Sequence, residues 1–195
     1  MSERFEYFYD FVSPYSYLAQ SQIPALVART GAELVYRPFF LGGVMQSSGN
    51  SPPATVPAKA KYMPVDIARW LDRYGIELKF NPFFPVNTVK AMRGALVALD
   101  DGCLEAYNTA LFEAMWLHEK NVAELDVLAE VISGAGLDVD SILKRIANEE
   151  VKERLKANSA EAVERGAFGS PTFFVGDEMF FGNDRLDFLE ERLEG

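Results

Sequence analysis

Cysteine, histidine and long apolar runs are scarce in this chain of 195 residues. A single cysteine, Cys103, excludes a disulfide framework and a thiolate metal site within one chain, and it is predicted to be a packed thiol. The single histidine, His118, ends an apolar stripe on a predicted helix, which favours a helix-end residue over a catalytic base. No span of about 18 apolar residues follows the charged N-terminus. We therefore expect a soluble cytoplasmic protein without a signal peptide or a membrane span.

Positive charge is also in short supply, with 19 Lys and Arg against 29 Asp and Glu and a formal net charge of −10. This balance argues against binding to nucleic acid or to an anionic membrane surface. It leaves small anionic ligands open, because helix N-termini and local basic groups can form a positive pocket. The chain is 49% hydrophobic, which is typical of a globular protein rather than a disordered one.

An apolar stretch over residues 5–11 carries aromatic side chains on both faces, as in a strand that is covered on both sides. It breaks at Ser13 and Pro14, and a proline at the first helical position predicts that a helix begins there. That helix is expected to end near Gly31, and residues 32–40 form the next strand. A strand, a helix and a strand in close succession predict a βαβ unit with parallel strands.

The middle of the chain changes in character. Residues 45–59 are rich in Ser, Pro, Gly and Ala and predict a long irregular loop. Apolar residues spaced three and four apart then predict helices over residues 65–74, 87–99, 104–115, 125–132, 138–146 and 149–165, the second of them capped by Asn87. Residues 172–175 and 179–181 flank a turn and predict a β-hairpin, and Asn183 or Asp184 would cap a last helix.

This order of elements predicts an α/β protein: a thioredoxin-like fold with an inserted all-helical domain. We expect residues 1–43 and 149–195 to form the thioredoxin-like domain and residues 44–148 to form the helical insertion. A cleft is expected where the two domains meet.

Two serines stand at the turn where a thioredoxin-type redox protein has its cysteine pair. Such a protein places Cys-Pro-x-Cys at the first strand–helix turn, opposite a cis-proline that precedes a late strand. Here Ser13 and Ser16 replace the cysteines, and Ser170 and Pro171 precede the late strand. The replacement excludes dithiol chemistry at this motif, so the sulfur for which the scaffold is suited must come from a ligand. Taken alone, Ser13 would also serve as an ordinary helix N-cap, and Pro171 could be trans.

Five motifs recur in the same order in one known group of proteins. They are residues 10–18 (Asp-Phe-Val-Ser-Pro-Tyr-Ser-Tyr-Leu), residues 49–53 (Gly-Asn-Ser-Pro-Pro), Lys59-x-x-Tyr62-Met63, residues 168–172 (Phe-Gly-Ser-Pro-Thr) and residues 181–186 (Phe-Gly-Asn-Asp-Arg-Leu). On these motifs the whole chain resembles 2-hydroxychromene-2-carboxylate isomerases and their relatives, the kappa-class glutathione transferases. Both belong to the broader family of disulfide-bond-forming proteins with a helical insertion. The resemblance implies a glutathione-binding homodimer and a cis peptide bond before Pro171.

The resemblance also implies a glutathione site that consists of Ser13, Pro14, Tyr15, Asn50, Ser170, Pro171, Asn183 and Asp184. The Ser13 hydroxyl would face the glutathione sulfur, and the backbone of Ser170 would pair with the cysteinyl part. Asn50 would approach the tripeptide, while Asn183 and Asp184 would hold its γ-glutamyl end. The residue types suit these roles, because a donor at a helix N-terminus stabilises a thiolate and a carboxylate binds an ammonium group.

In function, the resemblance implies interconversion of 2-hydroxychromene-2-carboxylate and trans-o-hydroxybenzylidenepyruvate, or of a similar small aromatic acid. Glutathione would be a regenerated cofactor, because thiolate addition to the conjugated carbon allows rotation and elimination restores the alkene. The candidates for contacting the substrate are Arg37, Lys59 and Arg93 as cations, and Tyr62 and Asn87 as hydrogen-bond donors. Two alternatives stay open: a kappa-class-like transferase that releases a stable conjugate, and a non-catalytic glutathione-binding or chaperone-like module.

Overall fold

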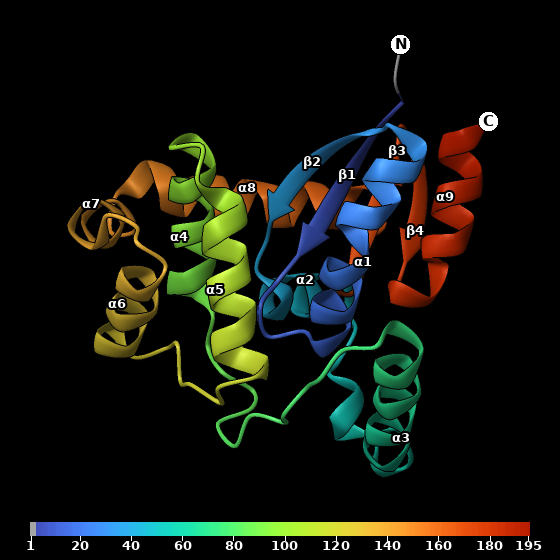
Figure 1. Cartoon of the computed structure of the whole chain (residues 1–195), viewed down its shortest axis with the longest axis horizontal. Helices are drawn as coiled ribbons and strands as arrows, with labels where there is room; N and C mark the ends of the chain where they lie inside the picture. The colour runs from blue at the N-terminus through green and yellow to red at the C-terminus, as the bar shows by residue number, and fades with distance from the viewer. Residues whose placement is uncertain (1–2) are drawn as a thin grey trace.

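A four-stranded mixed sheet in the order β2–β1–β3–β4 is assembled from the two ends of the chain (Figure 1). The computed structural model describes residues 3–195. β1 (Arg4–Tyr9) pairs in parallel with β2 (Glu33–Pro38) and antiparallel with β3 (Thr172–Val175), which pairs antiparallel with β4 (Glu178–Phe181). This topology confirms the predicted parallel pair, the predicted hairpin and the thioredoxin-like fold.

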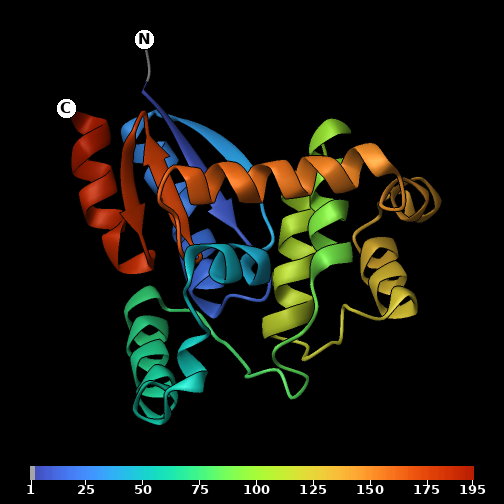
Figure 2. The same cartoon turned by 180° about the vertical axis from the view of Figure 1, so that it is seen from behind.

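Helices cover both faces of the sheet and fill the sequence between β2 and β3. α1 (Pro14–Thr30) and α9 (Leu186–Glu194) contact each other on one face, and α8 (Glu149–Glu164) runs across the other face (Figure 2). The remaining helices are α2 (Leu41–Ser48), α3 (Pro57–Tyr74), α4 (Val89–Asp100), α5 (Leu104–Trp116), α6 (Leu125–Gly134) and α7 (Val139–Arg145). Within residues 3–195, no helix combines the length and the apolar composition that crossing a membrane requires.

The prediction of an irregular loop over residues 45–59 is wrong. α2 occupies Leu41–Ser48, a short 3₁₀ helix covers Pro53–Thr55, and α3 already begins at Pro57. The glycines of α2 serve close packing, since a Cβ on Gly42 would lie 2.8 Å from the Phe40 ring. Pro57 occupies the first turn of α3, where its missing N–H costs no helical hydrogen bond. Residues that usually interrupt helices are therefore compatible with helices at these positions.

Two predicted N-caps are also corrected. A 3₁₀ helix (Asn183–Arg185) precedes α9, and neither Asn183 nor Asp184 caps it with a side chain. The Asn183 amide instead donates to the Tyr74 hydroxyl, over 3.4 Å. α4 begins one residue later than expected, with Thr88 at its N-cap, although the Asn87 Oδ1 still accepts a hydrogen bond from the Val89 N–H at 3.1 Å.

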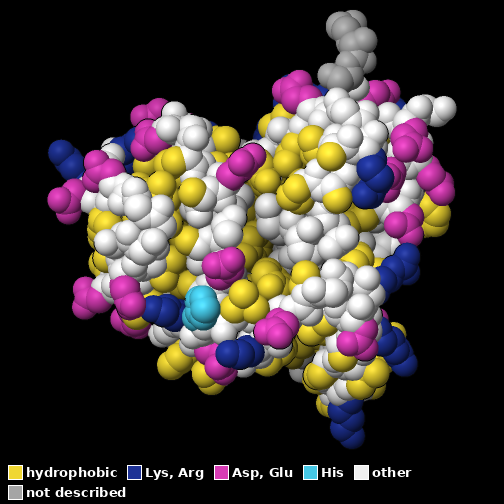
Figure 3. Space-filling view, in the orientation of Figure 1, with side chains coloured by type: hydrophobic (Ala, Val, Ile, Leu, Met, Phe, Trp, Pro, Cys, Tyr) yellow, Lys and Arg dark blue, Asp and Glu magenta, His cyan; other side chains and the backbone are white. Residues whose placement is uncertain are grey.

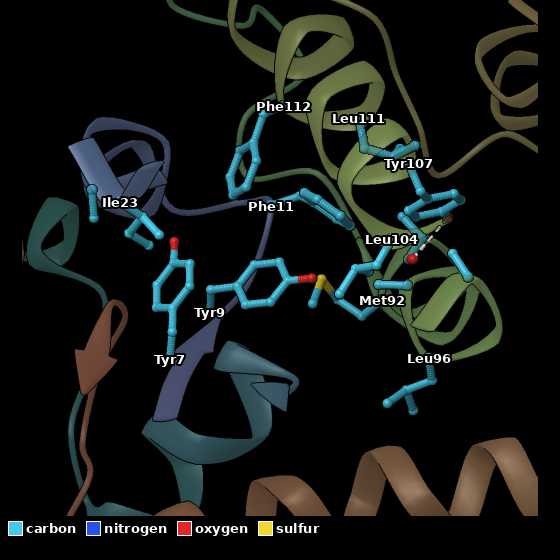
Figure 4. Close-up of a cluster of buried hydrophobic side chains, with 14 of the residues drawn as sticks. Tyr7, Tyr9, Phe11, Ile23, Met92, Leu96, Leu104, Tyr107, Leu111 and Phe112 are labelled. Carbon is cyan, nitrogen blue, oxygen red and sulfur yellow. Dashed lines mark hydrogen bonds between the residues drawn. The ribbon is translucent and has the colours of Figure 1, made fainter. Parts of the chain in front are cut away.

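The aromatic side chains of β1 anchor the strand on both faces. Tyr7 and Tyr9 point to one face, where Tyr7 stacks on Phe173 with ring centroids 5.0 Å apart. Figure 4 shows this cluster continuing from Tyr9 into the apolar side chains of α4 and α5. Phe8 points to the opposite face and packs with Phe174 beneath α8. Burying each such ring contributes about 1.5–3 kcal/mol, so the core holds the carboxyl end of β1 firmly in place.

Candidate functional site

The chain turns from β1 into α1 at Ser13, which caps the helix. The Ser13 N–H donates to the Asp10 carbonyl at 3.1 Å, and the Ser13 Oγ accepts from the Ser16 N–H at 3.1 Å. Pro14 occupies the first helical position. The capping role that the sequence allowed for Ser13 is thus confirmed, and it orients the hydroxyl at the positive end of the α1 dipole.

Three buried serines meet at this helix start, and we call Ser13, Ser16 and Ser170 the serine cluster. The Ser13 hydroxyl donates to the Ser170 carbonyl at 2.9 Å, which joins positions 157 residues apart. The Ser16 and Ser170 hydroxyls lie 2.7 Å apart. The Ser170–Pro171 peptide bond is cis, as expected. The two segments that the sequence analysis paired are therefore in direct contact.

Two hydrogen-bond donors at the start of α1, the Tyr15 N–H and the Ser13 hydroxyl, could bind a ligand. Pro14 has no N–H, and among the described residues no group accepts from the Tyr15 N–H. The Ser13 hydroxyl donates to the Ser170 carbonyl, and it would have to rotate away from this carbonyl to donate to an anion. An anionic atom at this position would receive two hydrogen bonds and the favourable helix dipole.

Asp10 fixes the turn from beneath. Its fully buried carboxylate accepts from the Val12 N–H at 3.1 Å, the Leu41 N–H at 2.9 Å and the Thr88 hydroxyl at 2.5 Å. Burial raises the pKa of Asp10 to about 6, and the hydrogen bonds, led by that from Thr88, oppose the rise. The sequence analysis assigned no role to Asp10, although a carboxylate directly after an apolar strand could have indicated a buried hydrogen-bond acceptor at this turn. It ties the α1 turn to the starts of α2 and α4.

Asn50 lies beside the segment that precedes the cis-proline. Its side-chain amide donates to the Phe168 carbonyl at 2.8 Å. The Phe168 ring lies against the Phe181 ring with centroids 4.4 Å apart, and both rings are more than a third exposed. The loop after α2 is thereby joined to the segment that carries Ser170.

A chain of hydroxyls connects α1 to α3. The Tyr15 and Tyr62 hydroxyls both donate to the Asp66 carboxylate, at 3.2 and 3.3 Å. Burial raises the pKa of Tyr15 well above its usual value, and the nearby Asp66 raises it further. Lys59 stands exposed on the same helix, three residues before Tyr62. The structure thus links Tyr62 on α3 to Tyr15 on α1 through Asp66, a residue that the sequence analysis did not single out.

Asn183 and Asp184 follow directly on the cis-proline strand pair. The Gly182 N–H donates to the Pro171 carbonyl at 3.0 Å, which places this segment beside the serine cluster. Gly182 has a φ of 99°, and a Cβ there would lie 2.3 Å from an Asp184 carboxylate oxygen, so only glycine fits. Asn183 is buried, whereas Asp184 is 45% exposed and pairs with Arg185 at 2.6 Å.

Three of the residues proposed for substrate contact do not contact the serine cluster. Arg37 forms ion pairs with Glu6, at 3.0 Å, and with Glu161 beneath α8. Arg93 lines a separate hollow between α2, α4 and α8. The exposed Asn87 is engaged at the start of α4. The other two candidates, Lys59 and Tyr62, lie on α3, which contacts α1.

The scarce residues Cys103 and His118 lie on another part of the molecule. Cys103 immediately precedes α5, and burial raises the pKa of its thiol, which agrees with a packed, unreactive side chain. His118 follows α5 and lines a hollow of about 610 Å³ between α5 and α6, together with acidic side chains. Figure 3 shows this histidine in cyan on a face over which acidic groups are spread.

Comparison with known proteins places this geometry in a family. The model of the family described as DSBA-like thioredoxin domain matches residues 4–194. A 2-hydroxychromene-2-carboxylate isomerase from Sphingobium xenophagum is 34% identical over 99% of both chains. Glutathione S-transferase kappa 1 from Rattus norvegicus is 30% identical over 94% of this chain and 88% of its own. A solved 2-hydroxychromene-2-carboxylate isomerase structure superposes with a TM-score of 0.87 at 30% identity, covering 97% of this chain and 94% of the other.

The chain therefore belongs to the DSBA-like thioredoxin family, in the branch that contains the 2-hydroxychromene-2-carboxylate isomerases and the kappa-class glutathione transferases. These relatives support an enzyme of isomerase or transferase type.

Proposed function

We propose that this protein is a glutathione-dependent isomerase of 2-hydroxychromene-2-carboxylate or a closely similar aromatic acid. The observation that carries the proposal is the serine cluster. Ser13 and Ser16 stand at a helix N-terminus against a cis-proline, a place that suits a thiolate, yet the only cysteine lies elsewhere. The proposal includes the cytoplasmic location and the homodimer expected from the sequence.

The residues around the serine cluster fit glutathione. Ser13 and the Tyr15 N–H would hold the sulfur, and the Ser170 backbone would hold the cysteinyl part, since no described residue accepts from the Ser170 N–H. Asn50 borders the same segment. The γ-glutamyl end would lie by Asn183 and Asp184, whose carboxylate is still half exposed to a ligand ammonium. When bound, glutathione supplies a thiolate for reversible addition to the conjugated carbon of the ring-opened acid.

Ser13 acts here as a hydrogen-bond donor and not as a nucleophile. A serine nucleophile needs an adjacent base, and the described partners of the Ser13 hydroxyl are backbone groups of Ser16 and Ser170. Asp10 does not fill that role, because the described partners of its carboxylate are Val12, Leu41 and Thr88 and not the Ser13 hydroxyl. The donated Ser13 proton and the α1 dipole instead lower the pKa of a thiol placed at the helix start.

The substrate end of the proposed site is α3. Lys59 supplies a cation for the substrate carboxylate, and the Tyr62 hydroxyl supplies a donor for the developing enolate oxygen. The Tyr62 and Tyr15 hydroxyls both donate to the Asp66 carboxylate, so Tyr62 lies near α1, and its hydroxyl would turn from Asp66 to donate to the substrate. Arg37, Arg93 and Asn87 are left out of this part of the proposal.

The test follows the absorbance of both acids with and without glutathione and titrates free thiol at the end of each run. The isomerase proposal predicts turnover that needs glutathione and leaves the thiol concentration unchanged. Turnover at the full rate without glutathione would overturn it. The kappa-class relative favours a second candidate, a transferase, for which free thiol would fall in step with product. Glutathione binding without any turnover would indicate a binding module.

A further inference from the structure

A hollow lies where α2, α4 and α8 come together, on the side of the sheet that α8 covers. Figure 2 shows these three helices on the face that α8 crosses. The hollow has a volume of about 310 Å³, which is at the lower end of the range for small-molecule pockets. Neither Ser13 nor Ser170 is among its lining residues, so it is distinct from the serine cluster.

The lining of this hollow has the opposite charge to the rest of the chain. Arg93, Lys152 and Lys156 all contribute to it, and none of the described side chains that line it is acidic. This concentration occurs in a protein whose formal net charge is −10. Arg93 lies close enough to Lys156 to oppose its protonation, although the pKa of Lys156 is raised, mainly by its hydrogen bond to Glu153. Such a group attracts an anion.

Arg93 is the cation that most needs a partner. Its Nε is buried without a hydrogen-bond partner, and the described residues provide no ion pair for its guanidinium. The lysines are different, since Lys152 pairs with Glu149 and Lys156 with Glu153, each three residues before it on α8. A buried donor without an acceptor costs free energy, which a bound carboxylate would relieve.

Beside the cations, the lining includes two serines, Ser47 and Ser159, and several apolar side chains. Phe40 from the start of α2, Val89 from α4 and the buried Leu155 from α8 contribute side chains to the same hollow. Val89 and Arg93 are four residues apart on α4 and therefore project from the same side of that helix. A ligand that satisfies both parts of the lining has a flat or compact apolar body and one anionic group.

We propose that this hollow binds a small aromatic carboxylate, with the carboxylate at Arg93 and the ring against Phe40, Val89 and Leu155. The planar guanidinium of arginine matches a carboxylate in a two-point hydrogen bond. The lysines at the edge add charge but retain their own partners. The site goes beyond the proposed function and does not depend on it, because no residue of the serine cluster takes part.

The test uses the full chain and benzoate as the probe, with binding followed by calorimetry and by amide chemical shifts. Benzoate is expected to shift amides of α4 and α8 and to bind at least about tenfold more tightly than benzamide, which has the same ring without the charge. It should also bind more tightly than acetate or inorganic phosphate, which lack the ring. Equal affinity for benzamide, or tighter binding of phosphate, would overturn the assignment.

Variants locate the site. Arg93→Gln should weaken benzoate binding by about tenfold or more, and Lys156→Gln, at a more exposed position, by a smaller factor. The matched control is Arg154→Gln, which removes the same charge from α8 where Arg154 pairs with Asp100 at 2.6 Å. It should leave benzoate affinity unchanged. Unchanged affinity in both Arg93→Gln and Lys156→Gln, or displacement of benzoate by glutathione, would contradict the proposal.

Discussion

Ser13, Ser16 and Ser170 are buried and joined to one another, whereas Lys59, Tyr62 and Asp184 stand at the surface of α3 and of the 3₁₀ helix before α9. The first group is the sulfur end of the proposed glutathione site. The second group would bind the substrate and the γ-glutamyl end. Both ends are polar, but they differ in how firmly the fold holds them.

The two ends of the proposed site are therefore expected to respond differently to substitution. The sulfur end is set by β1, which is held by aromatic residues on both faces, and by Asp10 beneath the turn. A substitution there should change both stability and chemistry. The outer end is held by hydrogen bonds at the surface, which water can replace, so a substitution there should change affinity by a small factor and stability hardly at all.

The largest effect is expected at Asp10. The folded protein binds this proton more tightly than the unfolded chain does, since burial raises the pKa from 3.8 to about 6. The Asp10 carboxyl therefore makes folding less favourable as the pH rises through that window, by about 3 kcal/mol for about two pH units. In Asp10→Asn this dependence is absent.

Urea unfolding at several pH values checks the Asp10 prediction. The free energy of unfolding of Asp10→Asn minus that of the wild type should increase by about 3 kcal/mol from about pH 3.5 to about pH 6.5. A difference that stays constant over this range would show that Asp10 does not titrate as its burial implies.

Ser170→Ala should have the next largest effect. The Ser170 Oγ accepts from the Asp10 N–H at 3.2 Å and lies against the Ser16 hydroxyl, so its loss leaves buried groups without a partner. We expect the free energy of unfolding to fall by about 1–3 kcal/mol. Ser48→Ala, on the exposed end of α2, is the control and should change it by less than about 0.5 kcal/mol. Equal losses in the two variants would mean that the serine cluster adds nothing to stability.

The smallest effect is expected at the outer end. Asp184 is 45% exposed, so replacing it by asparagine should weaken glutathione binding by about fivefold or less, which corresponds to about 1 kcal/mol. Asp187→Asn removes the same charge three residues further on, at a side chain that is 80% exposed, and should leave the affinity unchanged. Calorimetry distinguishes the two. A loss of a hundredfold at Asp184 would mean that this end is as firmly held as the serine cluster.

The parts of this comparison that the sequence predicted rest on local patterns. Ser13 before Pro14 predicts the start of a helix, and the turn between β3 and β4 predicts a hairpin. The parallel pairing of β1 and β2 follows from the helix between them. The contact between Ser13 and Ser170 could be expected because the known apposition of this turn and a cis-proline supplied the long-range partner.

The missed features depend on partners far along the chain. Asp10 accepts hydrogen bonds from Leu41 and Thr88, which are 31 and 78 positions away. No local sequence pattern predicts contacts between residues so far apart. The second half of α2 was missed because the Ser and Gly residues at 47–49 were interpreted as a loop, whereas Gly49 ends the helix with a φ of 73°. Asn183 was expected to cap α9, but its side-chain amide donates a hydrogen bond to the Tyr74 hydroxyl on α3 instead.

The most direct test of the central claim is the pKa of the glutathione thiol when it is bound. The ultraviolet absorbance of the thiolate, followed against pH, should show a pKa below that of the free thiol, near 8.5, for the wild type and for Ser48→Ala. In Ser13→Ala the fold should remain, since Pro14 still begins α1, and the bound pKa should rise by about one to two pH units because a charged hydrogen bond is lost. A bound thiol that titrates identically in Ser13→Ala and in the wild type would contradict the account.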